Sequence, residues 1–178
     1  MKRVLITGGA GFIGSCLARH LINNSDYDVL VYDKLTYAAT LTSLNTVLEH
    51  PRFKFIQGDI CNKDAVSKSI STFDPDLIVH LAAESHVDRS IEGPQAFIET
   101  NVVGTLVMLQ AALAHWSSLA PERSAYFRFH HVSTDEVYGE SMLDVNEQKK
   151  TEHSILCPTN PYAATKAAGS AIKASKKK

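Results

Sequence analysis

The sequence predicts an α/β protein that is built on a doubly wound parallel sheet. Short apolar runs recur along the 178 residues, and they lack the polar alternation of strands that have one solvent-facing side. Stretches with helical spacing of apolar residues separate these runs, and a glycine-rich turn joins the first run to the first helix. Such alternation of strand and helix is typical of a parallel sheet that helices cover on both faces.

Five strands are predicted from the apolar runs, at residues 3–7, 28–32, 53–56, 77–81 and 127–133. Helical spacing predicts helices at 12–22, near 40–48, at 63–72 and at 95–116, and a last helix that begins near Pro161. Residues 140–157 are polar and irregular, which predicts a loop or mobile insert.

The formal net charge is −1, with 18 Lys and Arg residues against 19 Asp and Glu residues. This balance gives no electrostatic reason to expect binding to nucleic acid or to an anionic membrane. A basic cluster at the end of the sequence is interpreted as a solvated tail: Lys173, Lys176, Lys177 and Lys178. We find no apolar run that approaches the ~18 residues of a membrane span, so we expect no membrane partner.

Cys16, Cys61 and Cys157 are scattered, odd in number and without C-x-x-C spacing. We interpret them as reduced thiols, which predicts a cytoplasmic protein without a disulfide framework. The sequence contains no H-E-x-x-H motif and no cluster of Cys and His residues, so no metal site is predicted.

The glycine-rich turn reads TGGAGFIG at residues 7–14. Gly9, Gly11 and Gly14 fit the pattern G-x-G-x-x-G, and Gly8, Gly11 and Gly14 fit the related pattern G-x-x-G-x-x-G. Glycines at this spacing allow a tight turn, close approach to a pyrophosphate, and packing of helix on strand. N–H groups at the helix N-terminus would bind the phosphates. The pattern predicts a dinucleotide-binding (Rossmann) domain.

Asp33 ends the second predicted strand and is the expected partner of this turn. A carboxylate there can bind both hydroxyls of the adenosine ribose and would repel a 2′-phosphate. Asp33 therefore favours NAD over NADP, while the adjacent Lys34 weakens that preference. The alternative is an ordinary glycine turn with a surface aspartate.

Residues at the carboxyl ends of other strands are further candidates, because ligands of such sheets bind there. Gly58, Asp59 and Ile60 follow the third strand and could line an adenine pocket, although a plain strand-ending turn would look the same. After the fourth strand come Ala82, Ala83, Glu84 and Ser85.

The number of strands also bears on domain organisation. A complete dinucleotide-binding sheet commonly has six strands, whereas five are predicted here. We therefore expect one NAD-binding domain over residues 1–178, truncated before the last strands, with the C-terminal substrate domain absent.

Tyr162 and Lys166 form a Y-x-x-x-K pair in PYAATK. Positions four apart share one helix face, so the Lys ammonium can lie near the Tyr phenol. A free Tyr has a pKa of ~10, but a neighbouring Lys⁺ and a positive nicotinamide favour the phenolate, which could deprotonate a hydroxyl during hydride transfer. Taken alone, this spacing is more typical of an exposed helix face.

The glycine pattern, Asp33, Thr134 and the Tyr162/Lys166 pair together resemble the extended short-chain dehydrogenase/reductase family, whose triad is Ser or Thr, Tyr and Lys. Longer segments narrow the resemblance to the dTDP-glucose 4,6-dehydratases of deoxysugar biosynthesis. These segments are LAAESHVDRS (81–90), FIETNVVGT (97–105) and STDEVYG (133–139).

The resemblance implies a role for each residue of the reactive group. Tyr162 takes the proton of the C4 hydroxyl as hydride goes to NAD, and Thr134 hydrogen-bonds to that oxygen. Glu136 removes the C5 proton, which the C4 ketone has acidified, and Asp135 protonates the departing C6 hydroxyl. Hydride then returns to C6 and gives a 4-keto-6-deoxy sugar. Repulsion between adjacent carboxyls fits this division, because it favours one protonated and one ionised group.

His86 and Asp88 resemble family positions near the sugar, with a plain polar loop as the alternative, and Thr100 and Asn101 resemble positions on the cofactor side. The predicted catalytic residues are Thr134, Asp135, Glu136, Tyr162 and Lys166. The predicted cofactor-binding residues are Gly8, Gly11, Phe12, Ile13, Gly14, Asp33, Lys34, Asp59, Ile60, Ala82, Ala83, Ser85, Thr100, Tyr162 and Lys166. The predicted substrate-binding residues are Ser85, His86, Asp88, Thr134, Asp135, Glu136 and Tyr162.

The resemblance also implies partners. These are NAD as cofactor, dTDP-glucose as substrate, and a second copy of the chain, since the family forms homodimers through two long helices, here near 95–116 and 161–176. Residues 140–157 and 170–178 match the family poorly. Two alternatives therefore stay open: an inactive NAD-binding truncation product and, disfavoured by the acid pair, a nucleotide-sugar epimerase.

Overall fold

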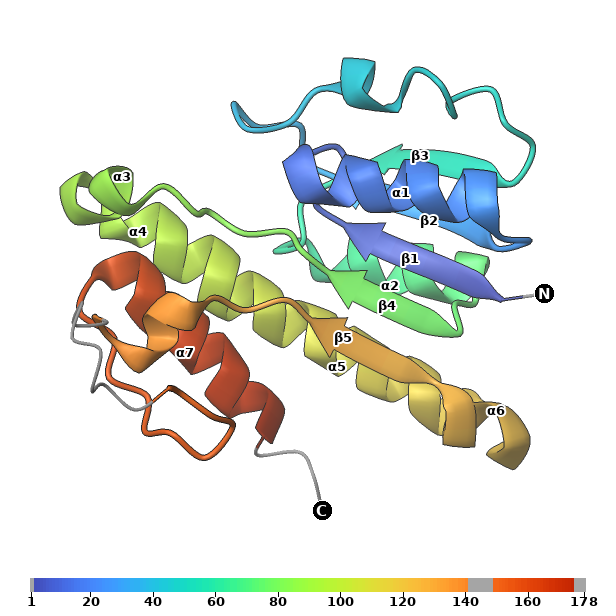
Figure 1. Cartoon of the computed structure of the whole chain (residues 1–178). Helices are drawn as coiled ribbons and strands as arrows, with labels where there is room; N and C mark the ends of the chain where they lie inside the picture. Colours follow the sequence, from blue (N-terminus) through green and yellow to red (C-terminus); the bar gives the residue numbers. More distant parts are fainter. Residues whose placement is uncertain (1, 141–148, 175–178) are drawn as a thin grey trace. The chain divides into compact units, whose positions relative to one another are not determined.

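All five predicted strands are present and form one parallel sheet (Figure 1). The computed structural model describes residues 2–140 and 149–174. The strands are β1 (Arg3–Thr7), β2 (Asp28–Asp33), β3 (Phe53–Gln57), β4 (Leu77–His80) and β5 (Arg128–His131), in the order β3-β2-β1-β4-β5. The order runs outward from β1 in both directions. The sheet therefore has a topological switch point between β1 and β4, where ligands of this architecture bind.

The chain divides into two compact units. The first consists of the residues up to Ala83 together with Gly104–Val132, and it holds the whole sheet. The second consists of Glu84–Val103 and the described residues from Ser133 onward, and its regular structure is helical. The assignment of residues 1–178 to one domain stays a prediction.

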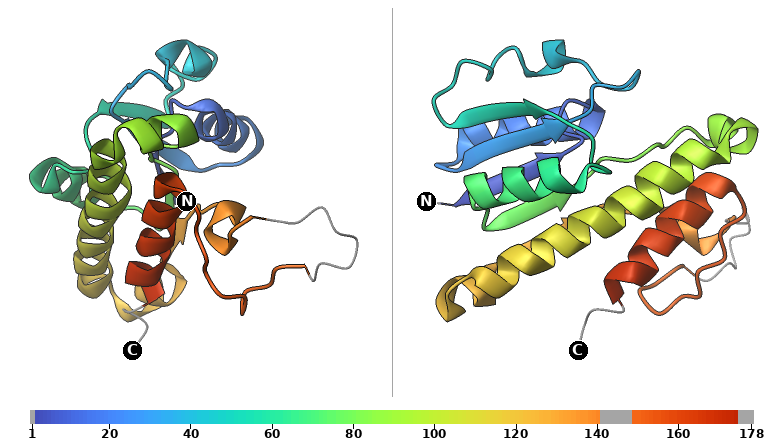
Figure 2. Two further views of the ribbon diagram at one scale, coloured as in Figure 1. Left: turned by 90° about the vertical axis from the view of Figure 1, so that its left-hand side faces the viewer. Right: turned by 180° about the vertical axis from the view of Figure 1, so that it is seen from behind.

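Helices cover both faces of the sheet in the first unit. α1 (Phe12–Asn24) and the segment 35–48 pack on one face, and α2 (Lys63–Phe73) and α5 (Thr105–Ser118) pack on the other. Figure 1 shows α1 in front of the sheet, and the view from behind in Figure 2 shows α2 and α5 on the opposite face. A short helix, α6 (Pro121–Tyr126), leads from α5 towards β5. The predicted doubly wound arrangement is confirmed.

Successive side chains of the inner strands are buried on opposite faces of the sheet. Leu5, Leu30 and Ile78 belong to the core cluster that includes residues of α2 and α5. Their neighbours Val4 and Val29 belong to the cluster that includes residues of α1. Because both faces are covered, the strands read as continuous apolar runs in the sequence.

The helix predicted near residues 40–48 is wrong in length. The structure has a single 3-10 turn there, η1 (Leu41–Leu44), which begins where the Thr40 hydroxyl accepts a backbone N–H two residues further on. Within the segment, Leu44 and Val47 are the residues buried in the core. One turn is enough to bury this pair, and the Thr and Ser side chains around it compete with helical hydrogen bonds.

The second unit carries α3 (Val87–Glu92), α4 (Pro94–Phe97), η3 (Asp135–Tyr138) and α7 (Pro161–Ala174). α7 packs against α3, α4 and η3, and it begins at the predicted residue. Between α4 and α5 the chain forms a π-helix, η2 (Ile98–Gly104), which the helical pattern at 95–116 did not predict. π-Helical turns occur frequently at functional sites, and this one carries Thr100 and Asn101. Residues 141–148 of the expected loop, and Lys176, Lys177 and Lys178 of the expected tail, lie outside the described residues. Of Lys173, only the backbone is described.

One helical stretch, Pro94–Ser118, is long and apolar enough to cross a membrane by length and composition. The expectation that no apolar segment approaches that length is therefore wrong. In the first unit, however, Met108, Ala111 and Ala112 of this stretch are buried in the core. Core helices of soluble proteins pass the same test, so the stretch is weak evidence for a membrane span.

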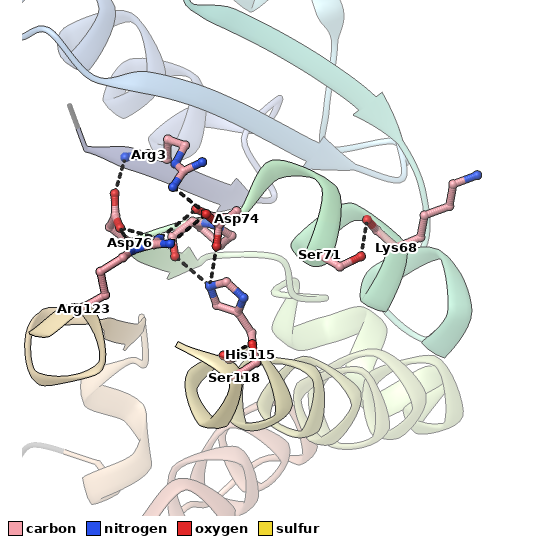
Figure 3. A network of polar contacts seen from close by, with 9 residues as sticks. Arg3, Lys68, Ser71, Asp74, Asp76, His115, Ser118 and Arg123 are labelled. Atoms are coloured by element: carbon pink, nitrogen blue, oxygen red, sulfur yellow. Dashed lines mark hydrogen bonds and ion pairs between the residues drawn. The ribbon is translucent and has the colours of Figure 1, made fainter. Parts of the chain in front are cut away.

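An ion-pair network joins the amino-terminal ends of β1 and β4 to α6 (Figure 3). Asp74 Oδ2 accepts from Arg3 Nη2 at 2.6 Å and from Arg123 Nη1 at 2.7 Å. Asp76 accepts from the Arg3 backbone N–H at 3.0 Å and from Arg123 Nη2 at 2.7 Å. Burial raises the pKa of both carboxyls, but the hydrogen bonds and the positive charges of Arg3 and Arg123 outweigh it. The pKa of Asp74 and that of Asp76 are held below their usual value.

We expect Arg123→Ala to lower the free energy of unfolding by about 1 kcal/mol at pH 7, because partly exposed ion pairs contribute ~0.2–1 kcal/mol each. The carboxyls have depressed pKa values in the folded chain. Their contribution to stability is therefore complete above the unfolded pKa and is lost as the pH falls through the folded pKa. Denaturant titrations at about pH 6 and about pH 3 should show the Arg123→Ala effect shrinking in acid.

Glu122→Gln is the matched control, since it removes an exposed charge from the first turn of α6. It should change the free energy of unfolding by less than about 0.5 kcal/mol. An Arg123→Ala effect of the same size at both pH values would contradict the proposed role of the carboxylates.

Candidate functional site

The glycine-rich turn between β1 and α1 leaves no room for side chains at three of its glycines, Gly8, Gly9 and Gly14. Gly8 has φ +70°, and a Cβ there would lie 2.6 Å from the backbone N of Ala82. A Cβ at Gly14 would collide with the carbonyl oxygen of Gly8. α1 starts at Phe12 with Gly11 as its N-cap, without a side-chain cap or an acidic residue in the first turn. The positive end of the helix dipole is thus left to an external anion, as a phosphate-binding turn requires.

Asp33 ties this turn to the end of β2. It is 7% exposed, and its Oδ2 accepts the Ala10 N–H at 2.9 Å while its Oδ1 accepts the Leu35 N–H at 2.8 Å. Each carboxylate oxygen has a second lone pair that could accept a hydrogen bond from a ribose hydroxyl. Binding of the ribose by Asp33 stays a prediction. Phe12 and Ile13, at the start of α1, are 92% and 62% exposed, which fits an apolar surface that a ligand covers.

Lys34 has an acidic partner. Its Nζ lies 2.6 Å from Asp59 Oδ2, and Asp59 Oδ1 accepts the Cys61 N–H at 2.9 Å. Burial raises the pKa of Asp59, but these two donors and the charge of Lys34 outweigh it, so the pKa is lowered. This pairing opposes the use of Lys34 to attract a 2′-phosphate. Ile60 is 5% exposed and packs at Gly104 in the core, so its side chain faces away from solvent and its backbone is the part that could reach a cofactor.

A buried chain of hydrogen bonds fixes the ends of β1 and β4. The Ala82 N–H donates to Thr7 Oγ1 at 3.3 Å, and the same hydroxyl pairs with His80 Nδ1 at 2.7 Å. His80 Nε2 lies 3.1 Å from Thr105 Oγ1 on α5. These contacts hold the β4 end against Gly8. Thr7 and His80 could not be predicted as site residues from the sequence, because each ends an apolar run and nothing in the pattern marks a polar partner across the sheet.

In the second unit the structure gathers Thr134, Asp135, Glu136 and Tyr162. Thr134 is the N-cap of η3: its Oγ1 accepts the Glu136 N–H at 3.3 Å and lies 3.3 Å from Asp135 Oδ1. The Thr134 hydroxyl also hydrogen-bonds to the Tyr162 phenol, and both carboxylates lie near enough to act on its ionisation. The Thr134 hydroxyl and the two acids of η3 therefore all act on the Tyr162 phenol of α7.

The prediction that the pKa of Tyr162 is lowered is wrong for the chain's own groups. Burial raises the pKa above 10.0, the Thr134 hydrogen bond lowers it, and the negative charges of Glu136 and Asp135 raise it further. Phe97 adds to the burial, with its ring edge-on to Tyr162 at 6.5 Å between centroids. The Y-x-x-x-K spacing carries no information about burial by other segments or about acids from them, which is why it predicted the opposite direction.

Lys166 is buried one turn further along α7. It is 4% exposed, and burial lowers its pKa from 10.5 to about 8. At pH 7 the side chain is still mostly an ammonium, but it can give up its proton far more readily than a surface lysine. Buried lysines of this kind are suited to proton transfer.

Residues outside the predicted catalytic set hold the start of α7. Ser90 Oγ accepts the Tyr162 N–H at 3.2 Å, and Asn101 Nδ2 donates to Thr165 Oγ1 at 3.0 Å. Asn101 also exchanges two hydrogen bonds of 2.9 Å with the Glu84 backbone. Because Asn101 is 2% exposed and both ends of its amide are used inside the protein, its side chain does not support the expected place on the cofactor side.

The other predicted substrate residues lie near the start of α3. His86 is the N-cap of α3, Asp88 is in its first turn, and both are exposed, as is Ser85. Thr100 is partly buried within η2, and Ala83 is partly buried at the end of the first unit. Exposure leaves the α3 residues available to a ligand, and their roles stay predictions.

The first unit fits a dinucleotide. A turn closed by Gly8 and Gly14, a helix N-terminus without its own acceptor, and Asp33 at the next strand end are the parts that bind pyrophosphate and ribose in such domains. Among the described residues, no group of three or more His, Cys, Asp and Glu side chains is arranged to hold a metal ion.

Sequence comparison identifies relatives among nucleotide-sugar dehydratases. The dTDP-glucose 4,6-dehydratase of Shigella flexneri is 52% identical over 171 residues, which make up 93% of this chain and 47% of that protein. The dTDP-glucose 4,6-dehydratase 1 of Escherichia coli K12 is 50% identical over the same length. The chain spans about half the length of the curated relatives it matches.

Solved structures of nucleotide-sugar enzymes are also similar to this chain. A dTDP-glucose 4,6-dehydratase from Streptomyces venezuelae, solved with NAD bound, has a TM-score of 0.83 and 42% identity over 97% of this chain and 51% of that one. The UDP-glucose 4-epimerase of Thermus thermophilus, a complex with NAD, has a TM-score of 0.80 and 28% identity, over 97% and 50% of the two chains.

The family follows from the extent of the match. The profile of the GDP-mannose 4,6 dehydratases matches residues 5–176, which is nearly the whole chain. The names of the relatives confirm the resemblance that the sequence motifs predicted. The chain belongs to the GDP-mannose 4,6 dehydratase family.

Proposed function

We propose that the chain provides the cofactor-binding and acid–base residues of a dTDP-glucose 4,6-dehydratase, an NAD-dependent lyase. The observation that carries this proposal is the group formed by Thr134, Asp135, Glu136 and Tyr162. Oxidation and re-reduction at one carbon need a single proton acceptor. Expulsion of water needs a proton acceptor and a proton donor as well, which the two adjacent acids supply.

NAD is the proposed cofactor, held by the first unit. When bound, NAD supplies the redox chemistry, which is removal of a hydride from C4 of the sugar and its return to C6. The turn at Gly8–Gly14 and the N-terminus of α1 would hold the pyrophosphate, and Asp33 would hold the adenosine ribose. Support comes from the turn geometry and from structural relatives that were solved with NAD.

Tyr162 is the proposed acceptor of the C4 hydroxyl proton. The hydrogen bond from Thr134 keeps the phenol oxygen in place and favours its ionised form, whereas the two acids oppose it. Ionisation therefore needs a nearby positive charge, and Lys166 is the proposed source. Its pKa of about 8 lets it carry that charge at pH 7 and still exchange a proton with the reaction.

Elimination follows from the C4 ketone, which acidifies the hydrogen on C5. Glu136 takes the C5 proton, and Asp135 gives a proton to the C6 hydroxyl, which leaves as water while a C5–C6 double bond forms. Addition of hydride at C6 and of a proton at C5 then gives the 4-keto-6-deoxy sugar. The sum is loss of one water without net oxidation, so the redox cofactor is regenerated.

dTDP-glucose is the proposed substrate because the relatives carry that substrate in their names. Ser85, His86 and Asp88, which are exposed at the start of α3, are proposed to contact it. We also propose a cytoplasmic location, and a homodimer through the helices near 95–116 and 161–176.

A nucleotide-sugar epimerase is the second candidate, favoured by the structural similarity to UDP-glucose 4-epimerases. Such an enzyme oxidises and re-reduces one carbon, so the pair Asp135–Glu136 would have no task in it. The two functions differ in product mass, because epimerisation leaves the mass of the sugar unchanged.

We expect Tyr162→Phe to reduce water loss from dTDP-glucose about 10²- to 10⁴-fold, since it removes the proposed proton acceptor. NAD affinity, measured by calorimetry, should change little because the pyrophosphate and ribose contacts are in the first unit. Tyr138→Phe, the same change at the end of η3, is the control and should keep the mass-spectrometric product signal. Dehydration at the wild-type rate in Tyr162→Phe would contradict the role. A wild-type chain that binds NAD but leaves the sugar unchanged would favour the alternative of an inactive NAD-binding truncation product.

Asp59→Asn should raise the affinity for NADP about 2- to 5-fold, because it removes the acid that pairs with Lys34 and exposed ion pairs contribute ~0.2–1 kcal/mol. NAD affinity should stay nearly constant, because the amide that replaces the carboxylate keeps an oxygen that can accept the Cys61 N–H. Calorimetric titrations with both cofactors measure the change. The double variant Asp59→Asn/Lys34→Ala should lose the gain, and a gain that survives in it would rule out Lys34 as its cause.

A further inference from the structure

Asn160 makes two hydrogen bonds that join the two halves of the reactive group. Its Oδ1 accepts the Ala163 N–H at 2.7 Å, which caps the N-terminus of α7 in front of Pro161. Its Nδ2 donates to Glu136 Oε2 at 2.8 Å. One planar amide thus connects the helix that carries Tyr162 to the turn that carries Glu136.

The orientation of this amide is fixed by its partners. A flipped amide would place Nδ2 against the Ala163 N–H, which is donor against donor. The same flip would place Oδ1 against the Glu136 carboxylate, which is acceptor against acceptor. The observed orientation satisfies both contacts, so Nδ2 is the end of the amide that faces the Glu136 carboxylate.

We propose that Asn160 is a positioning residue that holds the Glu136 carboxylate at a fixed place relative to Tyr162. The inference rests on the proposed function, in which Glu136 takes the C5 proton. Asn160 occupies Oε2 and leaves Oε1 as the oxygen that receives the proton. The other titratable groups nearby are Asp135, the preceding residue in the chain, and Tyr162, on whose pKa both acids act.

Two substitutions separate this role from simple helix capping. Asp and Ser cap helices about as well as Asn, so Asn160→Asp and Asn160→Ser should keep the melting temperature close to that of the wild type. Asn160→Asp replaces the donor by a carboxylate that repels Glu136, and Asn160→Ser is too short to reach it. Asn160→Ala loses the cap as well and serves as the structural comparison.

For dehydration of dTDP-glucose we expect kcat to fall about 10- to 100-fold in Asn160→Asp and Asn160→Ser, with KM nearly unchanged, because misplacement of a reacting group has effects of this order. The acid limb of the pH–rate profile should also move to higher pH in Asn160→Asp. A purely structural cap predicts wild-type kcat and an unchanged profile for Asn160→Asp, and that result would overturn the proposal.

A measurement without turnover separates this inference from the proposed function. In ¹⁵N-labelled wild-type protein, the side-chain amide signals of Asn160 should shift as the pH is lowered, and the shift should vanish in Glu136→Gln. Asn160 side-chain amide signals that respond neither to pH nor to Glu136→Gln would overturn the proposal, whether or not the chain is catalytically active. A wild-type chain without dehydration but with this titration would refute the proposed function while leaving the Asn160–Glu136 contact established.

Discussion

Burial of a parallel sheet on both of its faces is the constraint on which the first unit depends. Apolar side chains fill both sides of the inner strands, so polar groups are confined to the strand ends. Thr7, Asp33 and His80 stand at those ends, and each is buried with hydrogen-bond partners. They fix the backbone of the glycine turn and of the segment after β4. The rigidity of the proposed cofactor site is therefore a consequence of satisfying buried polar groups.

In the second unit, burial shifts both residues of α7 that the reaction would use, and negative charge adds to the effect on Tyr162 alone. The pKa of Tyr162 is raised and that of Lys166 is lowered to about 8, so the protein by itself shifts both groups towards their uncharged forms. A resting state with a protonated phenol follows. The proposed oxidation then needs positive charge beside the phenol, which Lys166, still mostly charged at pH 7, and the nicotinamide of a bound NAD would supply.

The sequence was sufficient for features that depend on local pattern. Apolar runs located the five strands, and the helix expected to begin near Pro161 is α7. The sequence did not predict features that depend on contacts between segments far apart in the chain. The segment at 40–48 forms one turn because two buried residues are all that the core receives from it. The pKa of Tyr162 is raised first by burial and then by acids that lie 26 and 27 positions earlier in the chain. Asn160 could be predicted as a helix cap from its place before Pro161, but not as a partner of Glu136.

In the proposed function, the acids beside Tyr162 carry out an elimination at the sugar. The most direct measurement is incubation of dTDP-glucose with the protein and NAD in D₂O, followed by mass spectrometry and proton NMR of the sugar. Abstraction of the C5 proton by Glu136 and return of a solvent proton predict a 4-keto-6-deoxy product with deuterium at C5. A dehydrated product that retains its original hydrogen at C5, or a sugar that has only been epimerised, would contradict the account.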